Sequence, residues 1–225
     1  MPRTFIYLLT TVCLIPTMVL STHAEDGNSQ TIQLFNGQDL TGWEHFLVDA
    51  NTKRDAVWSV EDGVLVCQGK PGGYLCTQKK YTNFRLAVEW RWPEKPGNSG
   101  VLMRITGKPT MLPNCVEAQL ASGSAGDMYG FQGFKIDGDK ARRFDNPNVA
   151  GGLAGLKKMS GNEKPAGEWN KYEITAQGGT ITVKVNGKLL NEATGCDVRA
   201  GQIGLQSEGG VIHFRNITLV PLKDE

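Results

Sequence analysis

The chain has 225 residues, with 24 basic and 23 acidic side chains, a formal net charge of +1 and 40% hydrophobic residues. It contains no run of basic residues and no stripe of basic and aromatic residues, so nucleic acid and anionic membrane surfaces are not the expected partners. Without the first 24 residues the basic and acidic side chains balance, and the remaining 201 residues suffice for one domain with its own core.

The first 24 residues have the three parts of a secretory signal peptide. Arg3 is a short basic region, residues 5–20 are apolar, and Ala24 ends a small-residue cleavage site. A membrane anchor is the alternative, but an apolar stretch of about 16 residues broken by Pro16 is short for a span of about 20. We therefore expect an exported, periplasmic or extracellular protein with no membrane insertion after cleavage. The expected organisation is a signal peptide (1–24), a polar lead-in (25–30) and one domain (31–225).

Short runs of strand-forming residues follow one another along this domain, separated by turn residues. In chain order they are TIQLF, VWSV, VLVC, GYLCT, residues 84–92 and 100–105, CVEAQLA, KYEITA, TITVKVN, GQIGLQS and VIHFRNITLV. Residues 84–92 and 100–105 read as two strands joined by a Pro/Gly turn. Asn186-Gly187 predicts a tight hairpin and Gly178-Gly179 another turn. We expect a short helical turn within residues 37–43 and irregular structure from 135 to 166.

The pattern as a whole predicts the fold class. Many short strands, 28 glycines and no long stretch with a 3.6-residue period indicate an all-β protein. Such a sequence is typical of an antiparallel two-sheet sandwich.

Four cysteines lie beyond the signal peptide: Cys67, Cys76, Cys115 and Cys196. An even number in an exported chain is compatible with two disulfides. If VLVCQGKPGGYLCT is a hairpin, Cys67 would lie opposite Cys76, which leaves Cys115 to pair with Cys196. Buried free thiols are the alternative, and the spacings do not resemble those of a zinc site.

Several predicted strands carry large polar side chains at their centres, on one face. They are Glu89, Arg91, Arg104, Glu117, Gln119, Gln206 and Glu208. A solvated sheet face would explain them without any function. The residue types favour a site, because carboxylates, guanidinium groups and amides beside small residues such as Gly100 and Gly204 suit a polyhydroxy ligand. Paired carboxylates also suit general acid–base chemistry.

Alternation along each strand also predicts which of these side chains lie close together. We expect the side chains of Glu89, Arg104, Glu117 and Gln206 to meet on one concave surface. Only His45 and His213 remain as histidines beyond the signal peptide, so a histidine-rich metal site has little to build on, and we expect His213 to point outward.

The motifs also resemble a known family. FNGQDLTGW, WSVEDGVLVC, GYLCT, YTNFRLAVEWRW, GNSGVLMR, CVEAQLASGSAGD, PAGEWNKYEI, VNGKLLNEATGC and IGLQSEGGVIHFRNI occur in the order seen in the 3-keto-disaccharide hydrolase domain, over about residues 32–222. The resemblance implies a concanavalin A-like jelly-roll sandwich, a fold found in this family largely in exported bacterial proteins. It also implies action on glycosides whose sugar carries a ketone at C3.

The resemblance implies a set of site residues as well. Those in family motifs are Glu89, Arg91, Arg104, Glu117, Gln119, Asp127 and Gln206, and Glu208 stands where some relatives carry histidine. A C3 ketone acidifies the C2 proton, so elimination followed by hydration cleaves the glycosidic bond without an oxocarbenium ion. We expect Glu117 to be the base, Arg104 to stabilise the enolate, and Glu89 to be an acid or metal ligand.

The remaining expected site residues, Arg91, Gln119, Asp127, Gln206 and Glu208, would bind the substrate. A divalent metal could replace the arginine, and the sequence does not decide this point. The expected partner is a carbohydrate, either a 3-keto-disaccharide or a 3-keto-glucoside. A lectin-like carbohydrate-binding module without catalysis and a structural domain of the cell envelope are the alternatives.

Overall fold

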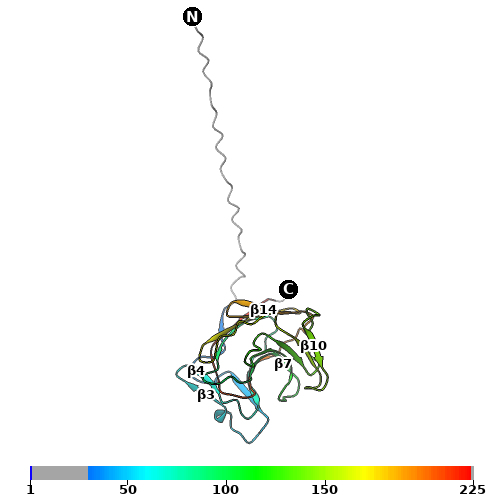
Figure 1. Ribbon diagram of the computed structural model, residues 1–225. Coiled ribbons are helices and arrows are strands. Elements are labelled where there is room, and N and C mark those ends of the chain that lie inside the picture. The colour runs from blue at the N-terminus through cyan, green and yellow to red at the C-terminus, as the bar shows by residue number, and fades with distance from the viewer. Residues whose placement is uncertain (2–29, 224–225) are drawn as a thin grey trace.

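The computed structural model describes Met1 and residues 30–223, so the expected signal peptide beyond Met1 and most of the lead-in lie outside the described residues. Two eight-stranded antiparallel sheets lie one inside the curve of the other (Figure 1). We call them the outer and the inner sheet. This arrangement confirms the predicted all-β sandwich of jelly-roll type.

The outer sheet has the strand order β14-β13-β12-β6-β16-β4-β3, with β1 paired to β16. Its strands are β1 (Ile32–Gln33), β3 (Trp58–Glu61), β4 (Val64–Cys67), β6 (Phe84–Arg91), β12 (Asn170–Gln177), β13 (Thr180–Val185), β14 (Lys188–Ala193) and β16 (Ile212–Pro221).

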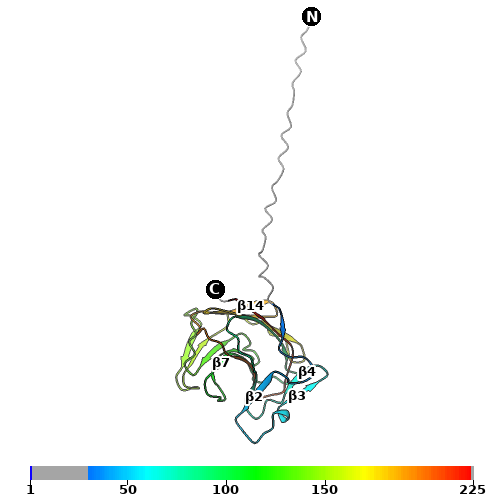
Figure 2. The same cartoon turned by 180° about the vertical axis from the view of Figure 1, so that it is seen from behind.

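The inner sheet has the strand order β10-β11-β9-β8-β7-β15-β5-β2. Its strands are β2 (Trp43–Leu47), β5 (Gly73–Thr77), β7 (Gly100–Thr106), β8 (Asn114–Gln119), β9 (Met128–Phe131), β10 (Arg143–Asn146), β11 (Leu153–Leu156) and β15 (Gln202–Ser207). From behind, β7 is again seen within the curve and β14 on the sheet around it (Figure 2).

The main core lies between the two sheets. Trp90 and Trp92 are buried in it, as their alternation with polar residues predicted. Trp90 packs on Tyr172 with ring centroids 4.6 Å apart. Each buried side chain of this size stabilises the fold by about 1.5–3 kcal/mol, so the pairing of the sheets rests on this layer.

Turn chemistry explains two of the connections. Asn186 and Gly187 both have positive φ, 51° and 80°, which matches the right-handed twist of a two-residue hairpin between β13 and β14 and confirms that prediction. The expected helical turn at 37–43 is wrong, because that segment consists of bends and a turn. The helical element in the described part of the chain is one 3₁₀ turn, Arg54–Ala56, and no helix there is long and apolar enough to cross a membrane.

Two further expectations are corrected by the topology. Residues 135–166 contain β10 and β11, so the segment is not irregular throughout. Residues 84–91 and 100–106 are strands, but β6 belongs to the outer sheet and β7 to the inner sheet, so the chain crosses the sandwich between them.

The predicted disulfides are also wrong, since all four cysteines are free and buried. Cys67 lies on the outer sheet and Cys76 on the inner sheet, so the stretch that joins them is a crossover and not a hairpin. Burial raises the pKa of the Cys67 thiol to about 11 and that of Cys76 to about 12, which makes both thiols poor nucleophiles.

Candidate functional site

The inner sheet turns one face to the core and the other, which we call the site face, to the inside of its curve. One row of mutually paired residues crosses the site face: Phe144, Gly155, Tyr129, Glu117, Leu102, Gly204, Cys76 and Glu44. Directly paired residues point to the same side of a sheet, so these side chains share a surface. A second apolar cluster, which includes Tyr74, Leu102 and Phe131, lies on this face.

Glu117, Gln206 and Glu208 form a group of two carboxyls bridged by one amide. The amide nitrogen of Gln206 lies 2.9 Å from Oε2 of Glu208 and 3.1 Å from Oε1 of Glu117, and it donates to both. Glu117 is 1% exposed and Gln206 is fully buried. A solvated face therefore does not account for these residues, and the predicted meeting of Glu117 with Gln206 is confirmed.

A glycine makes room for this group. Gly100 on β7 lies beside Glu117, and a Cβ there would lie 1.8 Å from Oε1 of Glu117 and 2.6 Å from its carboxyl carbon. Any larger residue would push the carboxyl out of its place, so Gly100 and Glu117 are sterically coupled.

The environment makes Glu117 a weak acid. Burial, and after it the negative charge of Glu208, raises the pKa of the Glu117 carboxyl well above its usual range. Burial likewise raises the pKa of Glu208. A carboxyl whose pKa moves toward neutrality is suited to proton transfer at physiological pH, and two such groups in one place titrate as a pair.

We expect this pKa to be visible in the protein's stability. In the unfolded chain the pKa of Glu117 is about 4.3. Above that pH the folded protein still holds a proton that the unfolded chain has lost, so the free energy of unfolding falls as pH rises through the raised pKa. Glu117→Gln removes this pH-dependent loss of stability. The difference between its unfolding midpoint and that of the parent should therefore increase from pH 4 to pH 8. Thermal unfolding at pH 4, 6 and 8 measures it; a difference that does not change with pH would contradict the assignment.

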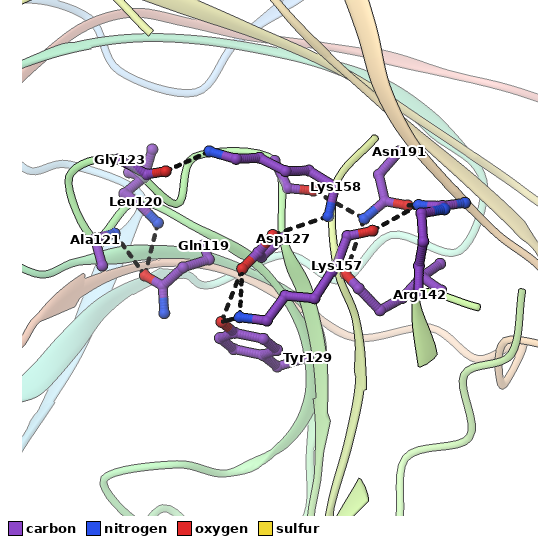
Figure 3. A network of polar contacts seen from close by, with 12 residues as sticks. Gln119, Leu120, Ala121, Gly123, Asp127, Tyr129, Arg142, Lys157, Lys158 and Asn191 are labelled. Atoms are coloured by element: carbon purple, nitrogen blue, oxygen red, sulfur yellow. Dashed lines mark hydrogen bonds and ion pairs between the residues drawn. The ribbon is translucent and has the colours of Figure 1, made fainter. Parts of the chain in front are cut away.

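Two more polar groups near Glu117 are left without partners among the described residues. Oε1 of Gln119 accepts hydrogen bonds from the backbone N–H groups of Leu120 and Ala121, both at 2.7 Å, which leaves the amide nitrogen pointing away from them (Figure 3). Oδ1 of Asn98 is buried and has no hydrogen-bond partner within residues 30–223. Asn98 directly precedes Ser99 and Gly100 in the chain. The amide nitrogen of Gln119 is a free donor for a ligand on the site face.

Asp127 anchors a polar network beside Glu117. It is 3% exposed and accepts hydrogen bonds from Nζ of Lys157 at 2.8 Å, from the hydroxyl of Tyr129 at 3.2 Å and from the backbone N–H of Lys158 at 2.9 Å (Figure 3). The hydrogen bond from Lys157 to Asp127 is the main reason why the pKa of Lys157 is raised, although burial opposes it. Lys157 therefore carries its charge on the site face.

The outer sheet holds this network in place. Asn191 of β14 donates from its amide to the carbonyls of Gly126 and Leu156, both at 2.9 Å. Its Oδ1 accepts from Nη1 of Arg142, which also donates to the carbonyl of Lys157 (Figure 3). Because Asn191 is fully buried, these bonds fix two backbone segments to the core, the one that precedes Asp127 and the one that carries Lys157.

Arg104 does not reach the site face, so the expectation that it converges with Glu117 is wrong. Its φ of 55° and the register shift of β7 turn the side chain out of the strand's parity. The guanidinium is buried and donates to the backbone carbonyls of Thr82, Gly178 and Asp197 at 2.7–3.0 Å. Arg104 thus joins three segments of the chain at one end of the sandwich.

Glu89 and Arg91 lie on the outer sheet and not with Glu117, which corrects the other half of that expectation. Glu89 accepts a 2.7 Å hydrogen bond from Nε of Arg215. Although burial opposes the change, hydrogen bonds and charges from Arg215 and its neighbours lower the pKa of Glu89. Nε of Arg91 donates to Nδ1 of half-buried His213 at 3.3 Å. The guanidinium groups of Arg91 and Arg215 both lie over the ring of Trp169.

Metal ligation is a separate question for the site face. Within residues 30–223 no three side chains of histidine, cysteine, aspartate or glutamate are grouped so that they could hold an ion. We assign no step to a metal.

Tyr129, Phe144 and Lys157 lie on the site face and were missed in the sequence. They come from β9, β10 and the residues after β11, in or next to the segment expected to be irregular. Alternation in MYGF was the available signal, since it places Tyr129 and Phe131 on one face. Asp127 of SGSAGD, by contrast, lies beside Gln119, whose backbone N–H donates to the carbonyl of Asp127 at 3.0 Å.

A family model confirms the resemblance seen in the motifs. The model, described as a 3-keto-alpha-glucoside-1,2-lyase-like domain, matches residues 30–220. The chain belongs to this family. The residues of the site face all lie within the matched region of the 3-keto-α-glucoside-1,2-lyase-like domain.

Relatives and solved structures agree with this assignment. The lyase-like chain is 25% identical over 233 residues to a Bacteroides thetaiotaomicron protein named 3-keto-disaccharide hydrolase, with 83% of this chain and 76% of the relative covered. It superimposes with a TM-score of 0.60 and 26% identity on a Parabacteroides distasonis protein described as a candidate glycosyl hydrolase, covering 86% and 100% of the two chains. A carbohydrate-binding module, CBM66 from Bacillus subtilis, shares the fold at 12% identity and a TM-score of 0.56, covering 80% and 96%.

Proposed function

We propose that this lyase-like chain is an exported enzyme that cleaves 3-keto-glycosides by elimination and hydration. The observation that carries the proposal is the buried Glu117 carboxyl, whose pKa is raised and which shares the Gln206 amide with Glu208. The matching family and the relative named 3-keto-disaccharide hydrolase support the substrate class.

Each step of the reaction has a residue of the site face for it. The two carboxyls titrate as a pair, and the reactive state is the one that carries a single proton, on Glu208. In that state the Glu117 carboxylate removes the proton from C2, and the electron pair moves toward the C3 oxygen to form an enolate. The amide nitrogen of Gln119, which has no partner among the described residues, donates to that oxygen. This role replaces the one expected for Arg104.

Bond cleavage and hydration complete the cycle. When the ketone re-forms, a double bond forms between C1 and C2 and the glycosidic oxygen leaves with the proton of Glu208, whose pKa is raised by burial. Water then adds at C1, Glu117 returns a proton to C2, and Glu208 recovers its proton from the water. The net reaction adds one water and releases the 3-keto-sugar and the alcohol.

A second candidate function is that of a lectin-like binding module. Aromatic side chains on the site face, Tyr129 and Phe144, favour it, because such modules bind sugars on aromatic rings. The same face therefore serves either function, and turnover decides between them.

The experiment that tests the proposal is turnover in heavy water. We expect 3-keto-glucosides to be cleaved with deuterium at C2 of the released sugar, and the unoxidised parent glycosides to be inert, since their C2 proton is not acidified. Free 3-keto-glucose incubated with the protein is the control for exchange after release. Cleavage of an ordinary disaccharide without deuterium at C2 would refute elimination, and binding of both sugars without turnover would favour the binding module.

Gly100→Ala should disable this chemistry. The new methyl group would overlap the Glu117 carboxyl, and misplacing a reacting group by about 1 Å can cost on the order of 10²-fold in rate. Gly161→Ala is the matched control, because a Cβ at Gly161 meets no atom within 4 Å. Steady-state turnover of both variants measures the effect, and the unfolding midpoint of each shows that it is folded. Equal turnover of the two variants would show that the position of the carboxyl is not critical.

A further inference from the structure

Phe144 forms an aromatic plate at one edge of the site face. It is paired with Gly155 of β11, and a Cβ on Gly155 would lie 2.2 Å and 2.3 Å from carbon atoms of the Phe144 ring. The ring therefore lies directly over the backbone of β11. Because one face of the ring covers that glycine, the other face is turned away from the sheet.

Tyr129 forms a wall beside this plate. Its ring lies at 81° to that of Phe144, with the centroids 5.8 Å apart. Tyr129 is also the residue paired with Glu117 on the next strand. The plate and the wall thus lead along one row toward the carboxyl that takes the C2 proton.

Lys157 supplies hydrogen-bond donors to the same corner. Its ammonium nitrogen lies 5.0 Å from the ring centroid of Phe144 and 5.7 Å from that of Tyr129, and the side chain is 54% exposed. Its N–H groups donate to Asp127 at 2.8 Å and to the hydroxyl of Tyr129 at 3.5 Å, so one of the three is left for a ligand. The amide nitrogen of Gln119 adds a further donor.

The opposite side of Glu117 has a different character. In the same row it continues to Leu102, Gly204 and Cys76, which are apolar or lack a side chain, and it ends at Glu44, whose carboxylate accepts a hydrogen bond from the amide of Gln202. At that edge Phe46 packs against Tyr74 with centroids 5.5 Å apart. Of these two edges, the one with Phe144, Tyr129 and Lys157 joins a ring plate, a wall and free donors, the combination that suits a sugar with one apolar face and a rim of hydroxyls.

We infer that Phe144, Tyr129 and Lys157 form a subsite for the leaving sugar of a disaccharide substrate. The inference rests on the proposed function, which sets the 3-keto ring at Glu117 and so makes the next sugar the leaving group. Its content is the assignment of these three side chains to the leaving sugar. Asp127 is a positioning residue here, because it acts through Lys157.

The test compares two substrates and two matched variants. Phe144→Ala should raise KM for a 3-keto-disaccharide by roughly 3–10-fold, the loss of one ring contact, and leave KM for the methyl 3-keto-glucoside unchanged. Phe144→Tyr keeps the plate and should restore KM. Phe46→Ala, a change of the same kind at the opposite edge, should not discriminate between the substrates.

The outcomes separate this inference from the proposed function. Binding of both sugars is measured alongside turnover. A ring-dependent preference for the disaccharide without turnover would support the subsite and overturn the proposed function. If Phe144→Ala changes the turnover of both substrates equally, or of neither, the subsite alone would be overturned. The same holds if Phe46→Ala weakens turnover of the disaccharide and not of the methyl glucoside. Absence of both binding and turnover would overturn both.

Discussion

Glu117→Gln should lower the turnover of a 3-keto-glucoside by roughly 10²–10⁴-fold while the sugar still binds, since the variant removes the base and keeps the shape of the side chain. The substituted side chain keeps an oxygen that can accept the hydrogen bond from the amide of Gln206, so the local arrangement should be retained. Turnover under saturating substrate and an independent titration of binding measure the two effects separately.

Glu89→Gln is the matched control for this variant. It makes the same chemical change on the outer sheet, where Glu89 pairs with Arg215 and does not face the site. We expect near-normal turnover from it. Strong loss of turnover in Glu89→Gln together with normal turnover in Glu117→Gln would reverse the assignment of the site to the inner sheet.

Arg104→Met should destabilise the fold without changing the chemistry. The variant leaves three partly buried carbonyl acceptors, those of Thr82, Gly178 and Asp197, without their donor. Each unsatisfied group of this kind costs about 1–3 kcal/mol, so the total is a large share of the roughly 5–15 kcal/mol by which a domain is stable. Denaturant unfolding measures the loss, and turnover per folded molecule should remain near that of the parent.

Arg54→Met is the control for the loss of one positive charge. Arg54 lies in the 3₁₀ turn and pairs with exposed Asp55, so its removal should change stability by no more than about 0.5 kcal/mol. Should Arg104→Met be as stable as Arg54→Met but inactive, the expectation from the sequence that Arg104 stabilises the enolate would be supported instead.

Local alternation predicted the site wherever two strands share a sheet. Glu117 and Gln206 meet because the strands that carry them, β8 and β15, both flank β7. Alternation along a strand shows which face of its own sheet a side chain lies on. It does not show which sheet the strand belongs to, because that depends on pairing with distant strands. Glu89 alternates as predicted on β6 and still lies on the wrong side of the molecule.

Backbone conformation explains the remaining misses. The positive φ of Arg104 interrupts the alternation of β7, and an arginine gives no sign in the sequence that it adopts this conformation. Phe144 was missed for a different reason, because β10 and β11 are four residues each and the segment around them is rich in glycine and asparagine. The family motifs supplied Asp127, which alternation alone did not.

The place of β16 has a consequence for how the chain folds. β16 is formed by Ile212–Pro221, yet it pairs with β1, β4 and β6. Ile32 thus pairs with Leu219, nearly the full length of the domain away. The outer sheet cannot close until these late residues have been made, so the first strand of the domain waits for the last one. Non-local pairing of this kind is characteristic of slow folding.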